Sequence, residues 1–211
     1  MPRKPPERSY DPEETRRLLI AAALDLFAEK GFRGTSVQEV ANRAGLTKGA
    51  FYHHFSTKDD VLHLIHDQFI DRALESQEQA LAAYDTATEQ LAKMAFDTTM
   101  ICIEYQKHVK VFFQELQELT MIGGEIREAI LDKRRRSTAL FAQVVRQGVE
   151  RGEFDRSLDP NVAALGLLGM WVWSYQWYHQ DGRRTPTEIA RQFAAMSLQS
   201  VGAKRSAAAL L

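Results

Sequence analysis

The sequence predicts an all-α protein of about nine helices arranged in two domains. Apolar residues recur at steps of three and four along most of the chain, which is the period of a helix with one buried face. Capping residues, prolines and glycines mark the ends of these stretches, and the alternation typical of a half-buried strand is nearly absent. A chain of 211 residues is also long enough to bury a substantial core.

The first helix is predicted between Asp11 and Gly31. Asp11 is a typical N-cap, because its carboxylate can accept hydrogen bonds from the amides of the first turn, and Pro12 follows at the first helical position. Gly31 ends the helix as a C-cap residue. The predicted buried stripe consists of Leu19, Ala22, Ala23, Leu26 and Phe27.

A short second helix is predicted after this glycine. Thr35 or Ser36 can cap it, and Gln38 or Glu39 can reach back to the backbone of the cap, as in a capping box. Gly45 then ends the helix.

A third short helix is predicted to begin at the Thr47 cap and to run to about Phe55. The sequence STKD at residues 56–59 is a further capping box that opens a long fourth helix. Two short helices that meet across a glycine, with a hydroxyl cap on the second, are typical of a helix-turn-helix. The sequence therefore predicts a three-helix domain of this kind at residues 11–56.

The rest of the chain is predicted to form a larger helical domain. Its joints are marked by the glycine pair at 123–124 and by the loops at 152–160 and 181–188, which end with a capping residue and a proline. The predicted helices are 57–83, 86–119 with a break, 124–151, 160–179 and 186–202. The expected organisation is a disordered arm at 1–10, the helix-turn-helix domain at 11–56, the larger domain at 57–204 and a frayed tail at 205–211.

Charge is unevenly distributed, although the net charge of the whole chain is only −1. Between Lys30 and Lys58 the only acidic residue is Glu39. Such a cluster of cations favours a polyanionic partner, because the local balance of charge decides what a surface attracts. The basic residues of this patch are Lys30, Arg33, Arg43, Lys48 and Lys58.

The composition indicates a reducing compartment and no membrane span. Cys102 is the single cysteine, so no intramolecular disulfide can form and a cytoplasmic location is expected. Residues 1–14 lack the apolar segment of a signal peptide. Residues 162–178 carry no charge, but two glycines, Ser174 and Gln176 interrupt them, so a helix buried between protein surfaces is expected there.

The third helix is predicted to present a polar, aromatic and basic face. Its apolar residues point inward, which leaves Thr47, Lys48, Gly49, Tyr52 and His53 outward near the N-terminal end. In a helix-turn-helix this end enters the major groove, where lysine can donate to guanine and the other side chains can contact bases, sugars or phosphates. We therefore predict that this face binds double-stranded DNA.

The first turns of two other helices are predicted to bind phosphate. Backbone amides near Thr35 and at Ser56 to Lys58 suit phosphate oxygens, and Lys58 adds positive charge. The alternative is that Tyr52 and the histidines are ordinary surface residues of a helical module that does not bind DNA. The full set of predicted DNA-binding residues is Thr35, Ser36, Arg43, Thr47, Lys48, Gly49, Tyr52, His53 and Lys58.

A long series of spaced residues runs through this domain, namely Leu19, Ala23, Phe27, Gly31, Thr35, Ala41, Ala44, Gly45, Gly49, Tyr52, Phe55 and Lys58. With this series, residues 15–62 resemble the DNA-binding domain of the TetR (tetracycline-repressor) family of bacterial transcription regulators. Val40 and Asp59 depart mildly from the family's usual isoleucine and glutamate. The resemblance implies contacts with DNA by Thr35, Thr47, Lys48, Tyr52, His53 and Lys58.

The same resemblance implies an all-helical ligand-binding domain and a homodimer formed by the last two long helices, with two reading heads on a palindromic operator. The predicted 160–179 helix agrees, because it is apolar nearly all round and a monomer would leave that surface in water. Ala163, Gly166 and Gly169 would let a partner helix approach closely. We expect a repressor that a small effector releases, although the sequence leaves open whether the ligand releases DNA or promotes its binding.

Aromatic and sulfur-containing side chains of the larger domain are candidates for an apolar effector cavity, with core packing as the alternative for each. Through Gly148, Phe154 and Trp177, among others, the C-terminal half loosely resembles TetR-type regulators that sense acyl-coenzyme A thioesters, which implies an apolar effector with a phosphorylated head. One or two cations of DKRRRS, residues 132–137, are candidates for binding such an anion. The candidate cavity residues are Phe96, Met100, Tyr105, Phe112, Phe113, Met121, Trp171, Trp173, Tyr175 and Trp177.

An enzyme and a helical adaptor are the alternative functions. His63, His66 and Asp67, or Glu104 and His108, are candidate metal ligands, but neither group forms a complete metal-binding motif. The sequence contains no phosphate-binding glycine loop, nucleophile elbow or cysteine-based site. We therefore expect a protein that is not an enzyme and requires no metal or cofactor.

Overall fold

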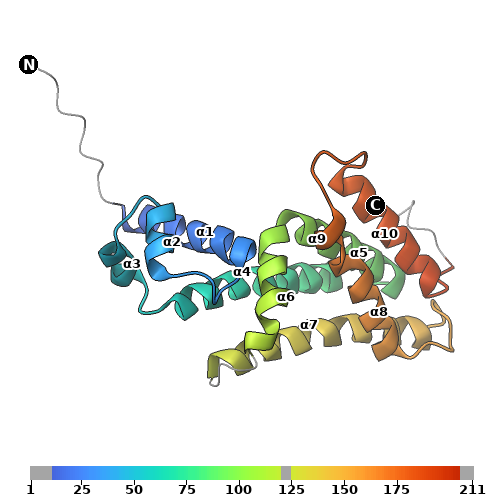
Figure 1. Cartoon of the computed structure of the whole chain (residues 1–211). Coiled ribbons are helices and arrows are strands. Elements are labelled where there is room, and N and C mark those ends of the chain that lie inside the picture. The colour runs from blue at the N-terminus through green and yellow to red at the C-terminus, as the bar shows by residue number, and fades with distance from the viewer. Residues whose placement is uncertain (1–10, 120–124, 205–211) are drawn as a thin grey trace, which may run out of the picture. The chain divides into compact units, whose positions relative to one another are not determined.

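The structure, a computed structural model, describes residues 11–119 and 125–204 (Figure 1). Every regular element in these ranges is a helix, and nine of the helices have seven residues or more. The predicted all-α class and number of helices are confirmed. Within the same ranges no helix is both long enough and apolar enough to cross a membrane.

The chain forms two compact units that divide between Ile65 and His66. The division falls inside α4 (Lys58–Ala83), so this helix contributes residues to both units. The sequence predicts the division earlier, after residue 56, just before α4 begins. The predicted arm at 1–10 and the predicted tail at 205–211 lie outside the described residues.

Unit 1 consists of three helices and the beginning of α4. The helices are α1 (Pro12–Lys30), α2 (Val37–Arg43) and α3 (Lys48–His54), and α1 contacts both of the shorter ones. Asp11 caps α1, because the amides of Glu13 and Glu14 donate to its carboxylate at 3.0 and 3.3 Å. The fully buried apolar residues of this unit are Leu19, Ala23, Phe27, Val40, Ala41, Phe51, Val61, Leu62 and Ile65.

Local hydrogen bonds fix the two short helices and the turn between them. Ser36 and Glu39 form the capping box of α2: the Glu39 amide donates to Ser36 Oγ at 3.3 Å, and the Ser36 amide donates to the Glu39 carboxylate at 2.8 Å. Gly45 follows α2 with φ of 70°, a left-handed value that glycine adopts without steric cost. Thr47 caps α3, since its hydroxyl accepts from the Ala50 amide at 3.1 Å. These contacts select Ser36 and Glu39 from the pairs that the sequence leaves open.

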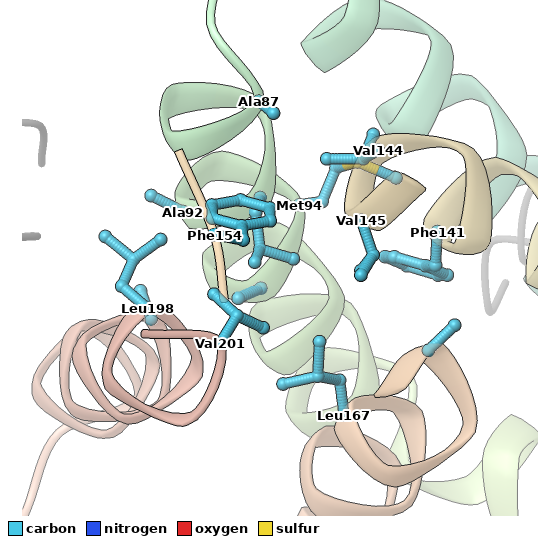
Figure 2. Close-up of a cluster of buried hydrophobic side chains, with 14 of the residues drawn as sticks. Ala87, Ala92, Met94, Phe141, Val144, Val145, Phe154, Leu167, Leu198 and Val201 are labelled. Atoms are coloured by element: carbon cyan, nitrogen blue, oxygen red, sulfur yellow. The ribbon is translucent and has the colours of Figure 1, made fainter. Parts of the chain in front are cut away.

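Unit 2 is organised around α5 (Ala87–Glu104). This helix contacts α6 (Gln106–Leu119), α7 (Glu125–Glu150), α8 (Pro160–Val172), α9 (Ser174–Trp177) and α10 (Pro186–Ser200). Figure 2 shows the apolar cluster at its centre, to which Met94 of α5, Phe141 of α7, Leu167 of α8 and Leu198 of α10 contribute. Burial of each such side chain is worth about 1.5–3 kcal/mol relative to exposure. The cluster therefore holds four helices together.

The predicted continuous helix at 160–179 is wrong, because the chain breaks at Trp173 into α8 and the single turn α9. The Gln176 amide donates to the Trp173 carbonyl at 3.1 Å, three residues back, as in a 3₁₀ turn. The side-chain amide of Gln106 in α6 donates to the carbonyls of Tyr175 and Tyr178 at 2.6 and 3.0 Å. A contact from another helix thus satisfies carbonyls that a continuing helix would have used. The break predicted within 86–119 is confirmed between α5 and α6.

Candidate nucleic-acid interface and effector cavity

One face of α3, together with the Thr47 cap, is an accessible polar surface. Phe51 is fully buried on one side of the helix, which fixes the face that points outward, and Tyr52 remains 52% exposed. The ammonium of Lys48 lies 5.8 Å from the centroid of the Tyr52 ring, within the range of a cation–π contact. The five predicted residues that lie together on this exposed face are Thr47, Lys48, Gly49, Tyr52 and His53.

Gly49 is not required by packing inside the protein. A Cβ atom at this position would meet only the Thr47 hydroxyl, at 3.7 Å, which is an ordinary van der Waals contact. The residue also lies in a regular helix, so its backbone needs no special conformation. A glycine here leaves the backbone of α3 accessible to a partner that approaches closely.

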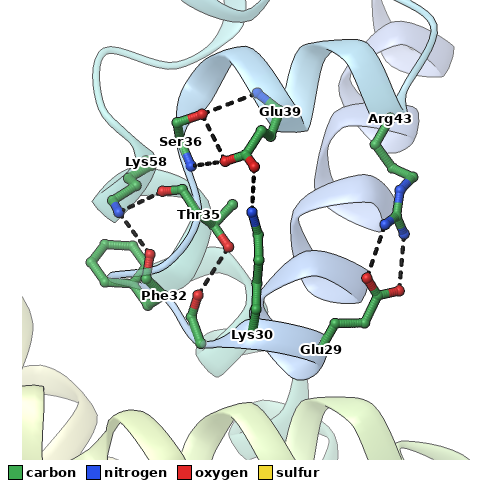
Figure 3. A network of polar contacts seen from close by, with 9 residues as sticks. Glu29, Lys30, Phe32, Thr35, Ser36, Glu39, Arg43 and Lys58 are labelled. Carbon is green, nitrogen blue, oxygen red and sulfur yellow. Dashed lines mark hydrogen bonds and ion pairs between the residues drawn. The ribbon is translucent and has the colours of Figure 1, made fainter.

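Lys58 and Thr35, both predicted to contact DNA, are engaged within unit 1 (Figure 3). The ammonium of Lys58 donates to the carbonyls of Phe32 and Thr35 at 2.7 and 2.8 Å, and it lies 4.2 Å from the centroid of the Phe32 ring. Thr35 is only 2% exposed, and its hydroxyl donates to the carbonyl of Gly31 at 2.9 Å. These contacts hold the loop between α1 and α2 against the first residue of α4.

Two further cations of the basic patch have carboxylate partners (Figure 3). Arg43 forms a bidentate pair with Glu29, with N–O distances of 3.0 and 2.9 Å. Lys30 pairs with Glu39, and this hydrogen bond, together with those from Ser36, lowers the pKa of the Glu39 carboxyl to about 2. The patch is therefore partly neutralised, and Lys48 is the patch cation on the exposed face of α3.

Unit 2 contains an apolar cavity of about 320 Å³. Phe69 and Ile70 of α4, Ile101 and Cys102 of α5 and Leu168 of α8 belong to its wall. Burial raises the pKa of the Cys102 thiol to about 12, as expected for a wall of low polarity. Ligand sites typically have volumes of roughly 300–1,000 Å³ and mostly apolar walls, so this cavity suits a small apolar ligand. The predicted residues that line it are Phe112, Phe113, Trp173 and Tyr175.

Several other candidate residues lie elsewhere. Trp171 is fully buried in the core of unit 2, where its Nε1–H donates to Ser197 Oγ at 2.8 Å and its ring lies 5.0 Å from that of Phe141. Trp177 is 43% exposed and contacts Phe193 in a separate groove of about 890 Å³ along α10. We favour the smaller cavity as the ligand site, because many residues of the larger groove are exposed to solvent. Of the remaining candidates, Phe96, Met100 and Tyr105 do not line the smaller cavity, and Met121 lies outside the described residues.

The cavity wall includes polar residues, of which the sequence indicates only Arg134, in the DKRRRS run, as a candidate ligand contact. Gln77 lies in the stretch ESQEQ, which resembles a solvated helix face, yet it is only 2% exposed. Its amide nitrogen donates to Ser137 Oγ at 2.7 Å. Arg134 and Thr138 of α7 also contribute to the wall. No signal in the sequence distinguishes Gln77 from its solvated neighbours, because its burial depends on helices packed against it.

The exposed side of α8 is apolar. Val162, Leu165 and Trp173 are 68%, 60% and 60% exposed. At Gly166 and Gly169 an added Cβ would meet no atom within 4 Å, so nothing in the protomer covers these positions. A contiguous apolar surface of this kind favours contact with another protein surface. It includes the predicted dimer residues Gly166 and Gly169, and the half-buried Ala163 lies on the same helix.

The candidate metal ligands do not gather into a site. In residues 11–119 and 125–204 there is no group of three or more histidine, cysteine or carboxylate side chains that could hold a metal ion. Burial lowers the pKa of His108 to about 4, so its ring is neutral near pH 7. That ring lies 5.2 Å from the ring of Tyr105.

Sequence comparisons connect the chain with bacterial regulators. Residues 19–65 match a family model described as bacterial regulatory proteins, tetR family, and residues 84–201 match a model described as tetracyclin repressor-like, C-terminal domain. The chain is 25% identical over 203 residues to the HTH-type transcriptional repressor KstR2 of Mycolicibacterium smegmatis, an alignment that covers 93% of this chain and 95% of that protein.

Structural comparisons lead to the same group of proteins. The ketosteroid transcriptional regulator KstR2 of Mycobacterium tuberculosis superposes with a TM-score of 0.83 at 24% identity over 90% of this chain and 95% of that chain, a similarity of fold. AibR in complex with isovaleryl coenzyme A and operator DNA superposes with a TM-score of 0.74 at 28% identity, over 87% of this chain and 97% of that one.

Proposed function

The chain belongs to the TetR family of bacterial regulatory proteins and is a helix-turn-helix DNA-binding regulator, and on that premise we propose a specific mode of action. The protein represses transcription in the bacterial cytoplasm by binding a palindromic operator as a homodimer. A small apolar effector, an acyl-coenzyme A thioester, binds in unit 2 and releases the DNA. The protein acts by binding and not by catalysis.

The exposed face of α3 is the observation that carries the DNA-binding part of this proposal. In a helix-turn-helix the second helix of the motif enters the major groove. The outward position of Lys48 and Tyr52 on α3, with Phe51 buried behind them, suits this orientation. Lys48 can donate to guanine or phosphate, Tyr52 can contact bases or sugars, and Gly49 allows the close approach of the backbone.

Selection of bound fragments from the source genome, followed by titration of the selected operator, tests DNA binding. Lys48→Met should weaken operator binding and reduce the slope of log K against log salt by about 0.9 for each phosphate that the variant no longer neutralises. Lys110→Met, which removes an exposed lysine of α6, is the matched control and should change neither quantity. Failure to enrich any fragment, or equal affinities for Lys48→Met and wild type, would contradict the proposal.

The apolar surface of α8 supports the homodimer. A second copy would cover Leu165 and Val162, and the bare positions at Gly166 and Gly169 would let its helix come close. Gly166→Arg should shift the protein from dimer to monomer in sedimentation experiments, because it places a charge in the proposed interface. Gln143→Arg introduces the same charge at an exposed position of α7 and should leave the dimer intact.

The effector assignment is supported by the cavity and by a relative. The cavity in unit 2 is apolar and of a suitable size, and AibR was solved with isovaleryl coenzyme A and operator DNA. An effector releases DNA if it binds more tightly to a conformation of low operator affinity. A coupling free energy of roughly 1–3 kcal/mol would change the affinity about 5- to 150-fold. Equal operator affinities with and without saturating acyl-coenzyme A thioesters of several chain lengths would refute this assignment.

A further inference from the structure

Four consecutive cations on α7 differ in their surroundings. Lys133, Arg135 and Arg136 each form an ion pair with carboxylates of α4 or α7. Among the side chains that the structure describes, no carboxylate forms an ion pair with Arg134, which is exposed. The guanidinium of Arg134 is therefore the one in this run that is available to an anion without the loss of an ion pair.

Arg134 also lies at the edge of the apolar cavity. Together with Thr138 it lines both the cavity of about 320 Å³ and an adjacent hollow of about 380 Å³. The adjacent hollow is lined further by the polar residues Arg135 and Asn161 and by the apolar residues Leu131, Ala139 and Ala142. The side chains of Arg134 and Thr138 thus lie between an apolar cavity and a mixed hollow that also holds the guanidinium of Arg135 and the amide of Asn161. A ligand with an apolar body and an anionic end fits these surroundings, because its body can occupy the apolar cavity while its anionic end lies against the guanidinium of Arg134.

Gln77 adds a second constraint on the ligand. Its amide nitrogen donates to Ser137, but its Oε1 atom is buried and accepts no hydrogen bond. A buried acceptor without a donor is unfavourable, because it has lost its hydrogen bonds to water. Since Ser137 lies one helical turn beyond Arg134 on α7, the Gln77 amide and Arg134 belong to the same side of the cavity. A hydroxyl or N–H group on the ligand would satisfy Gln77 Oε1.

The volume of the cavity limits which part of a ligand it can hold. At the roughly 30 Å³ that a water molecule occupies in the liquid, 320 Å³ corresponds to about ten small groups of atoms. This is enough for a medium-length acyl chain and too little for a complete coenzyme A thioester. The nucleotide of such a ligand would have to lie beyond Arg134, outside the apolar cavity.

We propose that the effector is an amphipathic anion that Arg134 and Gln77 recognise together. Its apolar body fills the cavity, a hydroxyl or amide N–H donates to Gln77 Oε1, and a carboxylate or phosphate accepts hydrogen bonds from Arg134. This inference rests on the proposed function, because it concerns the same effector cavity.

Isothermal titration calorimetry on the full-length protein tests the role of Arg134 with three probes: decanoyl-coenzyme A, 3-hydroxydecanoate and 1-decanol. At least one anionic probe should bind the wild type, with decanol at least about tenfold weaker. Arg134→Met should raise the Kd of that anion by about 10- to 100-fold, as expected for loss of a charge-assisted hydrogen bond, and should not affect decanol. Arg136→Met, which removes a cation that lines neither hollow, is the matched control and should bind like the wild type.

The two anionic probes distinguish the source of the negative charge. Tighter binding of decanoyl-coenzyme A would identify phosphate as the group that Arg134 binds. Tighter binding of 3-hydroxydecanoate would identify a carboxylate. Three results would overturn the role of Arg134: no binding of either anion to the wild type, equal binding of decanol and the anions, or an unchanged Kd in Arg134→Met. Operator binding without ligand should be the same in Arg134→Met and wild type. Its absence in the wild type would refute the proposed function and not the anion site.

Gln77 is tested by the difference between two ligands. The wild type should bind 3-hydroxydecanoate about 2- to 10-fold more tightly than decanoate, because only the hydroxy acid can donate to Gln77 Oε1. In Gln77→Met, a replacement of similar length, this ratio should fall to about one while decanoate still binds. A preference for the hydroxy acid that survives the substitution would show that another group recognises the hydroxyl.

Discussion

Lys58 offers the sharpest test of how unit 1 is held together. The sequence predicts it as a DNA contact, but its ammonium donates to the carbonyls of Phe32 and Thr35 and lies over the Phe32 ring. Lys58→Met keeps the aliphatic stem and removes the charge. We expect this variant to lose stability, because the two carbonyls lose their donor and the loop before α2 loses its attachment to α4.

The expected loss can be worked out from these contacts. A hydrogen bond to a charged group contributes about 1.5–3 kcal/mol, and a cation–π contact about 0.5–1 kcal/mol at an accessible site. The three contacts share one ammonium group, so their contributions are not additive. Lys58 is also only half-buried, and water can replace part of the stabilisation. We therefore expect the free energy of unfolding of unit 1 to fall by about 2–3 kcal/mol.

Urea denaturation followed by far-ultraviolet circular dichroism measures this loss, and titration of the operator at several salt concentrations measures the contacts with phosphate. Under conditions where both variants are folded, Lys58→Met should keep the salt slope of the wild type, while Lys48→Met should reduce it without a change in stability. The reverse pattern, with normal stability and a reduced salt slope for Lys58→Met, would refute the structural role assigned to Lys58.

Three further predictions concern stability. The pKa of Glu39 is lowered from 4.5 to about 2, so its ion pair and capping bonds stabilise the fold fully above about pH 5. This contribution is lost as the pH falls through about 2. The variant Glu39→Gln should therefore lose less stability than the wild type over this pH range in an acid-unfolding experiment. Gly148→Ala should destabilise unit 2 by about 1–3 kcal/mol in urea, because its Cβ would lie 2.1 Å from the buried ring of Phe154. Ser197→Ala should cost about 1–3 kcal/mol in the same assay, since it leaves the buried Trp171 N–H without an acceptor.

The sequence was sufficient to predict most of the helices and several of their caps, because these depend on residues only a few positions apart. The predicted capping box at 56–59 is wrong by one residue: the Asp60 amide donates to Thr57 Oγ1 at 3.2 Å, and the Thr57 amide donates to the Asp60 carboxylate at 2.8 Å. Asp11, Ser36 and Thr47 each accept hydrogen bonds from amides two or three residues further along the chain. The accessible face of α3 could be predicted for the same reason: once Phe51 is buried, the helical period determines which neighbouring side chains point outward.

Contacts between distant residues explain what the sequence could not predict. The carbonyls of Tyr175 and Tyr178, in and just after α9, accept hydrogen bonds from Gln106 of another helix. The ammonium of Lys58 donates to carbonyls more than twenty residues earlier in the chain. Glu29 neutralises the charge of Arg43 and lies one residue before the basic stretch from Lys30 to Lys58. The composition of that stretch alone therefore does not reveal the pair. Burial of Gln77 likewise results from its contact with Ser137 of α7. Periodicity and composition do not identify these partners.

The positions of the tryptophans make the two units spectroscopically distinct. All three indoles of the chain lie beyond residue 65, and Trp173 is at the cavity wall with 60% of its surface exposed. A ligand that fills the cavity changes the surroundings of this ring and should therefore change its fluorescence emission, with no label attached. Docking of α3 on a duplex would be followed through added dyes, so the two binding events can be recorded separately in a single cuvette.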